Sequence, residues 1–466
     1  MQESVRNTVR RASIRNDLRD DSGYALASVL FLVTILAVLS VIVLRADLAR
    51  RQMVVSEIDK FKSLSASQNG TLLAMNPQVV RFEDTTFSVV FDDSSRVEVD
   101  AFRWGLFYGV TSRGMSHRCE TTNSILVASA LPHGDSVALA ISNLQHGLVF
   151  AGSAKIVGNV VTGPMGVSTG SLRNFLSPKS LPLAGRKITV KTSFSTLDTS
   201  WLSGHVAFTK TLISRVRRSR ANPDDSASGV MKCVGVLDLK DIGDSIREVY
   251  CYGSILILDS IMRRGPPLFI VALGAVSFAK NVYVSGPVSI CSSDSICLSP
   301  GVACINCILT SEKSITLLPG CKVISQLFAP RLKLSGNTLA AYPSAAVSVS
   351  FVDTSGAGQS VEMQDGASVE GFVMMHRGSS TAMNDAVISL SPGATVVGGV
   401  YSDAYLTMDG VVDGYVRTFD LYFYDSPTTY VGWLRQGSIN RNNLPNGFLG
   451  PIGEQGLDPF EMLCEL

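Results

Sequence analysis

The longest apolar stretch of the chain runs from Tyr24 to Leu44, contains no charged residue and is followed by Arg45. As an α-helix these 21 residues would reach roughly 31 Å, about the thickness of a bilayer hydrocarbon core. No other segment approaches this length without a charge. The pattern therefore predicts a single membrane-spanning helix near the N-terminus, with the rest of the chain on one side of the membrane.

The helix is expected to continue beyond Arg45 into water. Apolar residues recur there at steps of four, three and three and form one stripe: Val54, Ile58, Phe61 and Leu64. Charged residues occupy the other faces, and the turn pair Asn69-Gly70 predicts the end of the helix. We expect a transmembrane and amphipathic helix over 24–66, whose lower part lies against a head domain.

The next region, 70–140, shows the alternation of short half-buried strands. The runs are Phe87–Phe91, Val97–Val99 and Trp104–Thr111, preceded by Val80 and Phe82 and separated by turn formers. We expect a small β-meander here.

A recurring pattern dominates the rest of the chain. The motif aliphatic-x-aliphatic-x-x-Gly-x-x-apolar occurs four times, with its glycine at Gly301, Gly320, Gly366 and Gly393. A second motif, apolar-x-Gly-x-Val, places its glycine at 158, 286, 371, 398 and 414. Short strands with inward aliphatic residues, each ended by a glycine corner, are what a parallel β-solenoid requires. A β-sandwich with irregular strands is the alternative architecture.

The predicted fold is therefore mainly β, with an N-terminal helix, a small meander and a parallel β-solenoid (β-helix)-like domain over 146–425. An irregular insertion is expected over about 181–250, where periodicity is poor. Its basic cluster, Arg215–Arg220, is interpreted as a solvated loop, with a phosphate or lipid site as the alternative. Residues 426–466, rich in Asn, Pro and Gly, are expected to form a cap and tail.

Composition narrows the class of partner. The 40 basic residues against 39 acidic ones give a net charge of +1, so bulk electrostatics favours no nucleic-acid partner. Charged residues make up only 17% of the chain, which also has 40 glycines. That balance is typical of a β-rich protein with many tight turns.

The chain has nine cysteines, five of them between Cys291 and Cys321. Four of these are weak candidates for a zinc site, because Cys304-x-x-Cys307 is a CxxC pair but the spacing to Cys291 and Cys297 is not that of a zinc finger or ribbon. Burial as small apolar residues is the simpler interpretation. Disulfides within the cluster are the alternative if this part lies outside the cytoplasm.

A search for catalytic groups finds no convincing set. The acidic pairs Asp92-Asp93 and Asp224-Asp225 occupy turn contexts, and Asp403, Asp409 and Asp413 lie near predicted rung corners. Five scattered histidines have no nucleophile motif or metal spacing beside them. We expect no enzyme activity and no cofactor.

The N-terminus carries a family resemblance. A polar leader, 1–23, bears five arginines and ends in Gly23, which is followed by Tyr24 and the apolar helix. This arrangement resembles type IV prepilins and type II secretion pseudopilins. The resemblance implies that a prepilin peptidase cuts after Gly23 on the cytoplasmic face and that Tyr24 is then N-methylated. Most members carry glutamate at the fifth mature position, where this chain has Ser28; minor members at filament tips, of the K-type and X-type, also lack it.

The resemblance implies a membrane-anchored structural subunit of a type II secretion or type IV pilus-like assembly. Its partners would be the lipid bilayer, other pilin-like subunits and the prepilin peptidase. The location would be the bacterial inner membrane, crossed once, with the C-terminal domain periplasmic or extracellular. Counting charges does not orient the helix, since five basic residues lie within about 20 residues of each end. The alternative is a signal-anchored envelope protein with a glycan-binding or glycan-cleaving β-helix domain.

Overall fold

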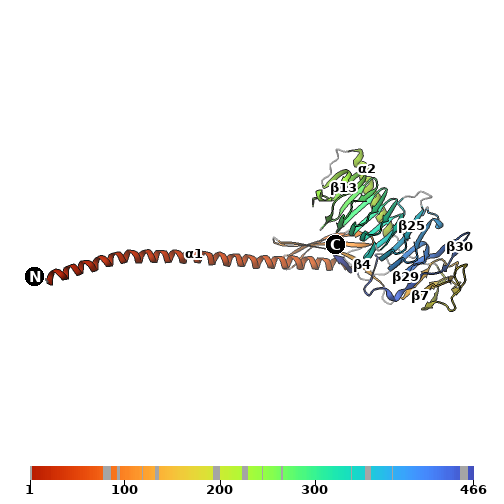
Figure 1. Ribbon diagram of the computed structural model, residues 1–466, viewed down its shortest axis with the longest axis horizontal. Helices are drawn as coiled ribbons and strands as arrows, with labels where there is room; N and C mark the ends of the chain where they lie inside the picture. Colours follow the sequence, from red (N-terminus) through yellow and green to blue (C-terminus); the bar gives the residue numbers. More distant parts are fainter. Residues whose placement is uncertain are drawn as a thin grey trace. The chain divides into compact units, whose positions relative to one another are not determined.

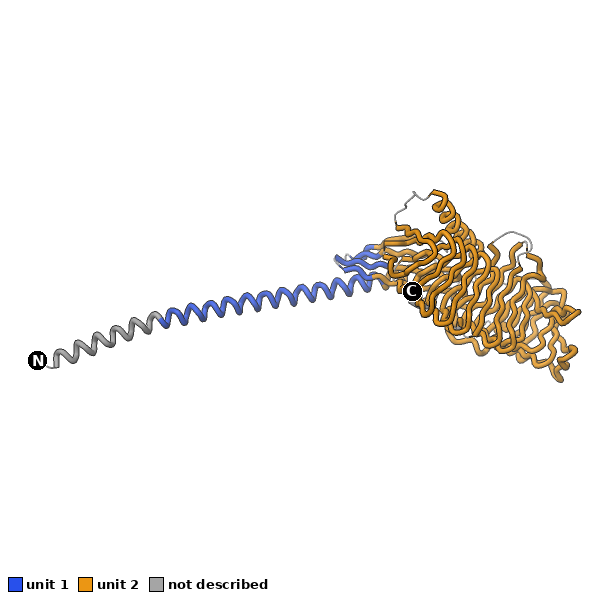
Figure 2. Tube along the Cα trace, turned by 45° about the horizontal axis from the view of Figure 1, so that its top comes forward, with its two compact units in different colours: residues 1–67, 90–97, 113–121 blue, residues 68–89, 98–112, 122–466 orange. Residues whose placement is uncertain are grey.

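The structure is a computed structural model. It describes residues 3–76, 85–91, 95–117, 119–131, 136–192, 200–222, 229–243, 245–263, 266–336, 338–351, 358–379, 381–451 and 460–465. Two compact units are present (Figure 2): unit 1 comprises 1–67, 90–97 and 113–121, and unit 2 comprises 68–89, 98–112 and 122–466. Unit 1 contains most of the long helix α1, Glu3–Ala74, and unit 2 contains most of the strands.

The helix α1 is longer than the sequence predicted, because it passes Gly70 and ends at Ala74. Thr71 and Ala74 are both buried in unit 2, and the Nδ2 atom of Asn123 donates to Thr71 Oγ1 at 3.3 Å. Burial of this last turn offsets the helix-weakening effect of an internal glycine, which is about 1 kcal/mol. The expected stop at Asn69-Gly70 was therefore wrong.

The predicted meander is present, and its strands follow the helix in chain order. They are β1 (Thr85–Val90), β2 (Arg96–Trp104), β3 (Phe107–Ser116) and β4 (Cys119–Ala130), hydrogen-bonded in the order β1-β2-β3-β4. Two strands near the C-terminus, β33 (Leu449–Gly450) and β34 (Phe460–Glu465), pair antiparallel with β4. The predicted strand residues Val80 and Phe82 lie outside the described residues.

One meander strand was predicted wrongly. Trp104–Thr111 is not continuous, since Gly105 adopts φ +63° and turns the chain between β2 and β3. The side chain of Gln326 holds this turn: its Oε1 accepts from Leu106 N at 2.6 Å and its Nε2 donates to Trp104 O at 2.9 Å. A carboxamide 220 residues away in sequence thus satisfies the turn's backbone.

A large parallel solenoid forms most of unit 2 and confirms the predicted fold class (Figure 1). Its main run is built from β12 (Val230–Leu237), β13 (Glu248–Ile257), β14 (Ile261–Met262), β15 (Leu268–Ala272), β16 (Val276–Phe278), β17 (Tyr283–Ser285), β18 (Val288–Ser292), β19 (Ser295–Leu298), β20 (Ala303–Ser311), β21 (Ser314–Leu317), β22 (Lys322–Ala329), β23 (Arg331–Leu334), β24 (Leu339–Val349), β25 (Gln359–Met363), β26 (Ser368–His376), β27 (Ala386–Leu390), β28 (Thr395–Met408) and β29 (Val411–Asp425).

Aliphatic side chains stack in columns along the solenoid interior. One column is fully buried and in register from rung to rung: Val249, Ile270, Ile290, Leu309, Leu327, Ala346, Val373, Val400, Val416, Leu139 and Val160. A second column contains the motif positions Ile296, Ile315, Val361 and Ile388, with Leu332, which belongs to neither motif, between Ile315 and Val361. Each contact removes apolar surface from water, at about 25 cal/mol per Å², so the repeat is the core.

The glycines of both motifs lie between strands or, for Gly371, Gly398 and Gly414, within β26, β28 and β29. All nine have φ between +73° and +155°, a region that side chains disfavour. In the second motif Gly371, Gly398 and Gly414 stack in register on successive rungs. A Cβ on Gly398 would lie 2.0 Å from the carbonyl oxygen of Gly371, so this column leaves no room for a side chain.

The order of rungs in space differs from their order in the chain. The early strands β5 (Val137–Ile141), β7 (Lys155–Val157), β8 (Asn159–Thr162), β10 (Leu183–Ala184) and β11 (Lys187–Thr189) stack beyond β29, the last strand of the main run. The chain then returns through the helix α2 (Ser200–Ala221), which packs near β13 at the opposite end of the stack (Figure 1). The segment 181–250 contains this crossover.

The C-terminal segment contributes strands to all three sheets of the described residues. β30 (Thr428–Val431) forms an antiparallel hairpin with β29, and β32 (Ser438–Asn440) lies in parallel between β29 and β7. β31 (Trp433–Leu434) pairs with β6 (Leu148–Phe150), which also pairs with β9 (Val167–Thr169). Three short 3-10 helices, Leu239–Asp241, Met383–Asp385 and Arg441–Asn443, complete the described elements.

Candidate functional site

The first candidate site is the apolar half of α1. The large apolar side chains from Tyr24 to Leu44 are exposed all round the helix, and Tyr24 itself is 79% exposed. Among the described residues this is the one helix long and apolar enough to cross a membrane. Such a surface would be costly in water, which makes lipid its natural environment.

Two polar side chains in this segment are bonded within the helix. Thr34 Oγ1 donates to the carbonyl oxygen of Leu30, and Ser40 Oγ donates to that of Leu36 at 2.7 Å. A hydroxyl bonded to its own backbone is compatible with hydrocarbon, where an unsatisfied polar group costs several kcal/mol. The segment is therefore suited to lipid along its whole length.

The residues implied in processing lie on this helix. Gly23 and Tyr24 are within α1, and Ser28 is exposed one turn further on. At the fifth position after Gly23 the surface thus carries a hydroxyl rather than a carboxylate.

The part of α1 that follows the apolar run contacts strands of unit 1 through a face of small residues. Ser63 Oγ lies 2.7 Å from Thr121 Oγ1, and a Cβ on Gly114 would fall 2.0 Å from the carbonyl oxygen of Ser63. Ser116 Oγ also donates to Asp59 Oδ1 at 3.3 Å. Close approach of strand and helix backbones explains why glycine and serine occupy this face.

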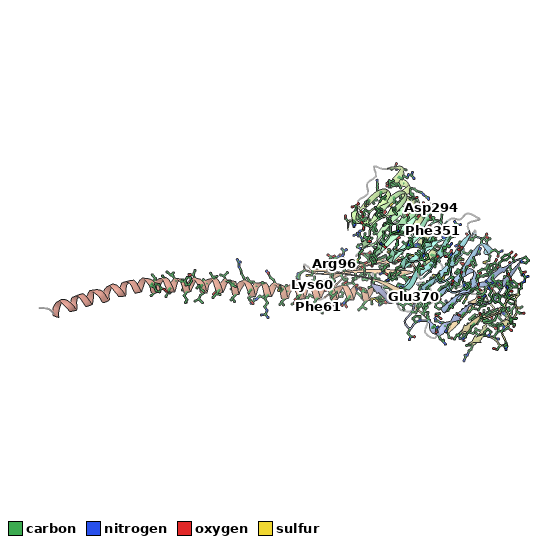
Figure 3. All side chains as sticks on the ribbon, viewed as in Figure 1. Lys60, Phe61, Arg96, Asp294, Phe351 and Glu370 are labelled. Atoms are coloured by element: carbon green, nitrogen blue, oxygen red, sulfur yellow. The ribbon has the colours of Figure 1, made fainter. Side chains whose placement is uncertain are left out.

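The apolar stripe does not supply the contact between helix and strands. Val54, Ile58, Phe61 and Leu64 are 42–72% exposed, with Phe61 the most exposed (Figure 3). The reason is steric: strand tips reach the helix only where small side chains allow close contact. The stripe is left as an exposed apolar surface in water, as binding surfaces often are.

A second candidate site lies in unit 2 beneath α2. A cavity of about 570 Å³ is lined by α2, the β2–β3 turn and strands of the solenoid, including Trp201, His205, Phe208, Trp104, Phe269 and Ile308. Burial lowers the pKa of His205 to about 4, so its imidazole is neutral at pH 7. His205 Nε2 lies 3.2 Å from Thr310 Oγ1, and its ring packs on Phe328. The lining suits an apolar group.

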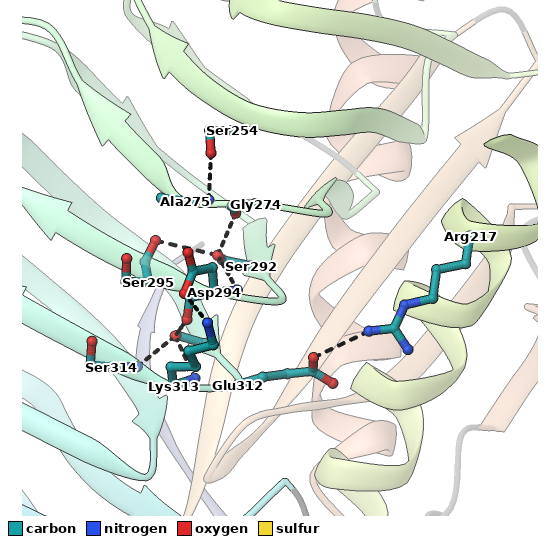
Figure 4. Close-up of polar contacts among 11 residues, drawn as sticks. Arg217, Ser254, Gly274, Ala275, Ser292, Asp294, Ser295, Glu312, Lys313 and Ser314 are labelled. Atoms are coloured by element: carbon teal, nitrogen blue, oxygen red, sulfur yellow. Dashed lines mark hydrogen bonds and ion pairs between the residues drawn. The ribbon is translucent and has the colours of Figure 1, made fainter.

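The basic cluster Arg215–Arg220 was wrongly interpreted as a loop, since it forms the C-terminal turns of α2. One face of α2 is buried against the solenoid, because Leu212, Ile213 and Val216 recur at helical spacing. These side chains pack on Tyr250, Val271 and Cys291. The opposite face of the helix therefore points away from the solenoid. Arg217 Nη2 reaches Glu312 Oε2 at 3.6 Å (Figure 4), and Arg215 Nη1 reaches Glu248 Oε1 at 3.1 Å. These two arginines pair with glutamates of the solenoid.

Serine hydroxyls close the solenoid corners beside this ion pair (Figure 4). Ser292 Oγ donates to Gly274 O at 2.8 Å and accepts from Asp294 N at 3.1 Å, and Ser311 Oγ accepts from Lys313 N at 3.1 Å one rung later. Lys313 Nζ pairs with Asp294 Oδ1 at 2.8 Å. These bonds satisfy turn backbones.

The four cysteines considered for zinc do not converge. Cys304 and Cys307 lie in the solenoid core, whereas Cys291 faces α2, and Cys297 is half-buried on β19. Burial raises the pKa of Cys291 to about 11 and that of Cys307 to about 12, so both thiols stay protonated. Cys304 stacks between Val284 and Val323, where it replaces an aliphatic residue. Within the described residues, no group of three His, Cys, Asp or Glu could hold a metal.

The three candidate carboxylates each bond a different partner. Asp403 Oδ2 lies 2.7 Å from His376 Nδ1, Asp409 Oδ1 accepts from Arg435 Nε at 2.7 Å, and Asp413 Oδ1 accepts from Asn443 Nδ2 at 2.8 Å. They are not brought together. Asp92-Asp93 and Asp224-Asp225 lie outside the described residues.

One polar centre was missed by the sequence analysis. Asp420, fully buried on β29, accepts from Asn143 Nδ2 at 2.7 Å and from Leu421 N at 2.8 Å, and its Oδ2 lies 3.1 Å from His146 Nδ1. Burial raises the pKa of this carboxyl, while the hydrogen bonds oppose the rise. The one sequence signal was an acid between two apolar residues, Phe419 and Leu421; its partners Asn143 and His146 are more than 270 residues away. The centre joins β29 to the segment between β5 and β6.

Replacing Asp420 should test that role. Asp420→Ala removes the acceptor that the buried Asn143 and Leu421 donors share, so we expect a loss of about 2–3 kcal/mol in the free energy of unfolding. Asp413→Ala, at an exposed bond, should stay within about 0.5 kcal/mol. Denaturant titration of both variants followed by circular dichroism measures the difference; equal midpoints would contradict the assignment.

Comparison with known proteins adds little. No family model matches the sequence, and no curated protein matches it. Among solved structures, the chain is similar to the crystal structure of the competence-associated pilin ComZ from Thermus thermophilus, at 8% identity over 88% of this chain and 97% of that chain. The TM-score is 0.16, too low to carry an argument about fold or function.

Proposed function

We propose that this chain is a membrane-anchored, pilin-like structural subunit whose head is a β-solenoid. The observation that carries the proposal is α1. An exposed, uncharged run from Tyr24 to Leu44 continues without a break into a charged helix that ends at Ala74. One helix that is suited to lipid in its first half and to water in its second half is the arrangement that the prepilin resemblance implies.

The exposed stripe supports assembly with other pilin-like subunits. Val54, Ile58, Phe61 and Leu64 form an apolar surface on a helix face that the described strands leave uncovered. A helix from a neighbouring subunit would bury this stripe and the lipid-facing segment together. The bilayer and like subunits are thus the proposed partners.

The head favours a minor rather than a repeating subunit. A solenoid of this size is too bulky to repeat at every position along a thin filament, and Ser28 lacks the carboxylate found in most repeating members. We place the subunit at a tip or initiation complex of a type II secretion or type IV pilus-like assembly. The proposed location is the bacterial inner membrane, with the head periplasmic or extracellular.

We assign a structural rather than a catalytic role to the head. The carboxylates of Asp403, Asp409 and Asp413 bond a histidine, an arginine and an asparagine, respectively. Each bond fastens one part of the solenoid to another. A glycosidase would need two carboxyl groups facing one substrate, whereas each of these three bonds another residue of the chain.

Processing at Gly23 tests the proposal. Expressed with a prepilin peptidase, the wild-type chain should lose residues 1–23, whereas Gly23→Val should keep them, since the implied cleavage follows a glycine. Ser28→Ala leaves Gly23 and Tyr24 unchanged and should be processed like the wild type. Gel mobility of the membrane-bound chain measures the outcome. A wild-type chain that keeps its leader in the presence of an active peptidase would contradict the proposal.

A further inference from the structure

Two cysteines outside the cluster noticed in the sequence meet across neighbouring strands. Cys233 on β12 is the register partner of Cys251 on β13, and the strands are parallel. The two Sγ atoms are 2.7 Å apart. Among the cysteines that the structure describes, no other pair of sulfur atoms lies within hydrogen-bonding distance.

The backbone geometry suits a covalent link. Directly paired residues on neighbouring strands have Cα atoms about 5 Å apart, inside the range of about 4.4–6.8 Å found in disulfides. The sulfur atoms are already closer than two non-bonded sulfurs normally lie, and a bond of about 2.05 Å requires only a small further movement. The two side chains leave the same face of the sheet.

The position of the cysteine pair on β12 indicates what a disulfide would do there. β12 is a poorly covered strand: Val234 is 75% exposed and Val236 is 52% exposed, and the register with β13 shifts between Cys233 and Gly235. A strand with few buried side chains opens more readily than the core. The cysteine pair sits immediately before that shift, where a covalent bond would hold β12 in register.

We propose that Cys233 and Cys251 are oxidised to an intrachain disulfide that joins β12 to β13. This inference rests on the proposed function, which puts the solenoid outside the cytosol, where disulfides persist. The pair is thus a modification site at the α2 end of the stack, separate from the cysteines between Cys291 and Cys321.

The reaction requires a disulfide-donor oxidant, such as a thiol–disulfide oxidoreductase or oxidised glutathione. Cys233 is half-buried, while Cys251 is fully buried. The Cys233 thiolate attacks the oxidant's disulfide, forms a mixed disulfide and expels one thiol. Cys251 then loses its proton and attacks the Cys233 sulfur, which releases the second thiol. Two cysteine thiols thereby give up two protons and two electrons, and the oxidant's disulfide becomes two thiols.

The shared hydrogen bond supports this order of attack. It lowers the pKa of Cys233 and, together with burial, raises that of Cys251. The more accessible cysteine is therefore also the more readily ionised one, as an attacking thiol should be.

Peptide mapping of the full chain in detergent provides the test. The protein is treated with oxidised glutathione, free thiols are alkylated, and trypsin is added. Cleavage at Lys232, Lys240, Arg247 and Arg263 separates the two cysteines, so a link appears as peptide 233–240 joined to peptide 248–263. We expect this joined species, its loss on reduction, and its absence in Cys233→Ser. Free, alkylated Cys233 and Cys251 after treatment would overturn the proposal.

Controls separate the link from general oxidation. Cys119→Ser removes another partly exposed cysteine and should leave the joined peptide unchanged. Oxidation should also slow hydrogen exchange of the β12 amides in the wild type and in Cys119→Ser, but not in Cys233→Ser. Cys233 is preferred for substitution because Cys251 is fully buried and its replacement could disturb folding by itself.

Mapping of protein alkylated inside intact cells then distinguishes the two proposals. The joined peptide in that sample supports both the link and a solenoid outside the cytosol. Free thiols in cells, in a protein that links on treatment with oxidised glutathione, would contradict the extracytoplasmic location and leave the pairing supported.

Discussion

Gly398→Ala is expected to lower the free energy of unfolding of the solenoid by about 4 kcal/mol or more, in the range that marks exceptional single substitutions. Gly398 has φ +141°, and a Cβ added to it would lie 2.0 Å from the carbonyl oxygen of Gly371 on the preceding rung. The rungs on either side are packed equally closely, since a Cβ on Gly371 would overlap Ser344 O and one on Gly414 would overlap Gly398 O. The neighbouring rung therefore has no space into which it could move. The clash falls on backbone atoms in the middle of the stack.

Gly366→Ala is the matched control. Gly366 is a motif glycine with φ +73°, but a Cβ there would meet nothing within 4 Å. Only the cost of placing a side chain in the left-handed region remains, about 1–2 kcal/mol. Denaturant titration of the full chain in detergent, followed by circular dichroism, compares the two variants. Equal losses would show that backbone conformation, and not the close approach of rungs, decides the stability of the solenoid.

The double variant Leu32→Arg/Leu36→Arg should release the chain from the membrane. The run from Tyr24 to Leu44 contains 14 Leu, Ile, Val and Phe residues, which favour insertion by about 0.3–0.6 kcal/mol each, or about 4–8 kcal/mol together. Two arginines near the centre cost about 2.5–3.5 kcal/mol each. One arginine would leave insertion favourable, whereas two remove most or all of the driving force.

Carbonate extraction of membranes measures this effect. The double variant should move from the pellet to the supernatant, while Val54→Arg/Phe61→Arg, on the exposed stripe of the same helix, should stay in the pellet. A double variant that remains membrane-bound would place the anchor elsewhere in the chain.

Sequence patterns predicted the solenoid because its rungs repeat the same chemistry. Ile296, Ile315, Val361 and Ile388 belong to one interior column, and the long gap between Gly320 and Gly366 holds the unrecognised rung of Leu332 and Leu334. Since each rung must match the one before it, the pattern could be seen without any contact being known.

The crossover could not be predicted in the same way. Strands β5 to β11 stack beyond β29, and this arrangement depends on pairings such as Val416 with Leu139, far apart in sequence. The helix α2 was missed because its apolar positions, Leu212, Ile213 and Val216, lie among arginines in a region with no strand periodicity. Its basic residues find their glutamate partners only in the folded chain.

In the helix α1 the sequence pattern was visible, but it did not indicate which face of the helix meets the strands. Its apolar stripe was visible in the sequence, but which face meets the strands depended on how closely backbones can approach. Gly114 and Ser63 decide this, because their small size lets strand and helix touch. Hydrophobic periodicity alone did not indicate this face.

The mass of the N-terminal peptide of the membrane-extracted protein decides whether this chain is processed as a pilin-like subunit. We expect a peptide that begins with N-methylated Tyr24, released by cleavage after Gly23. A peptide that begins at Met1, from cells with an active prepilin peptidase, would contradict the pilin-like assignment.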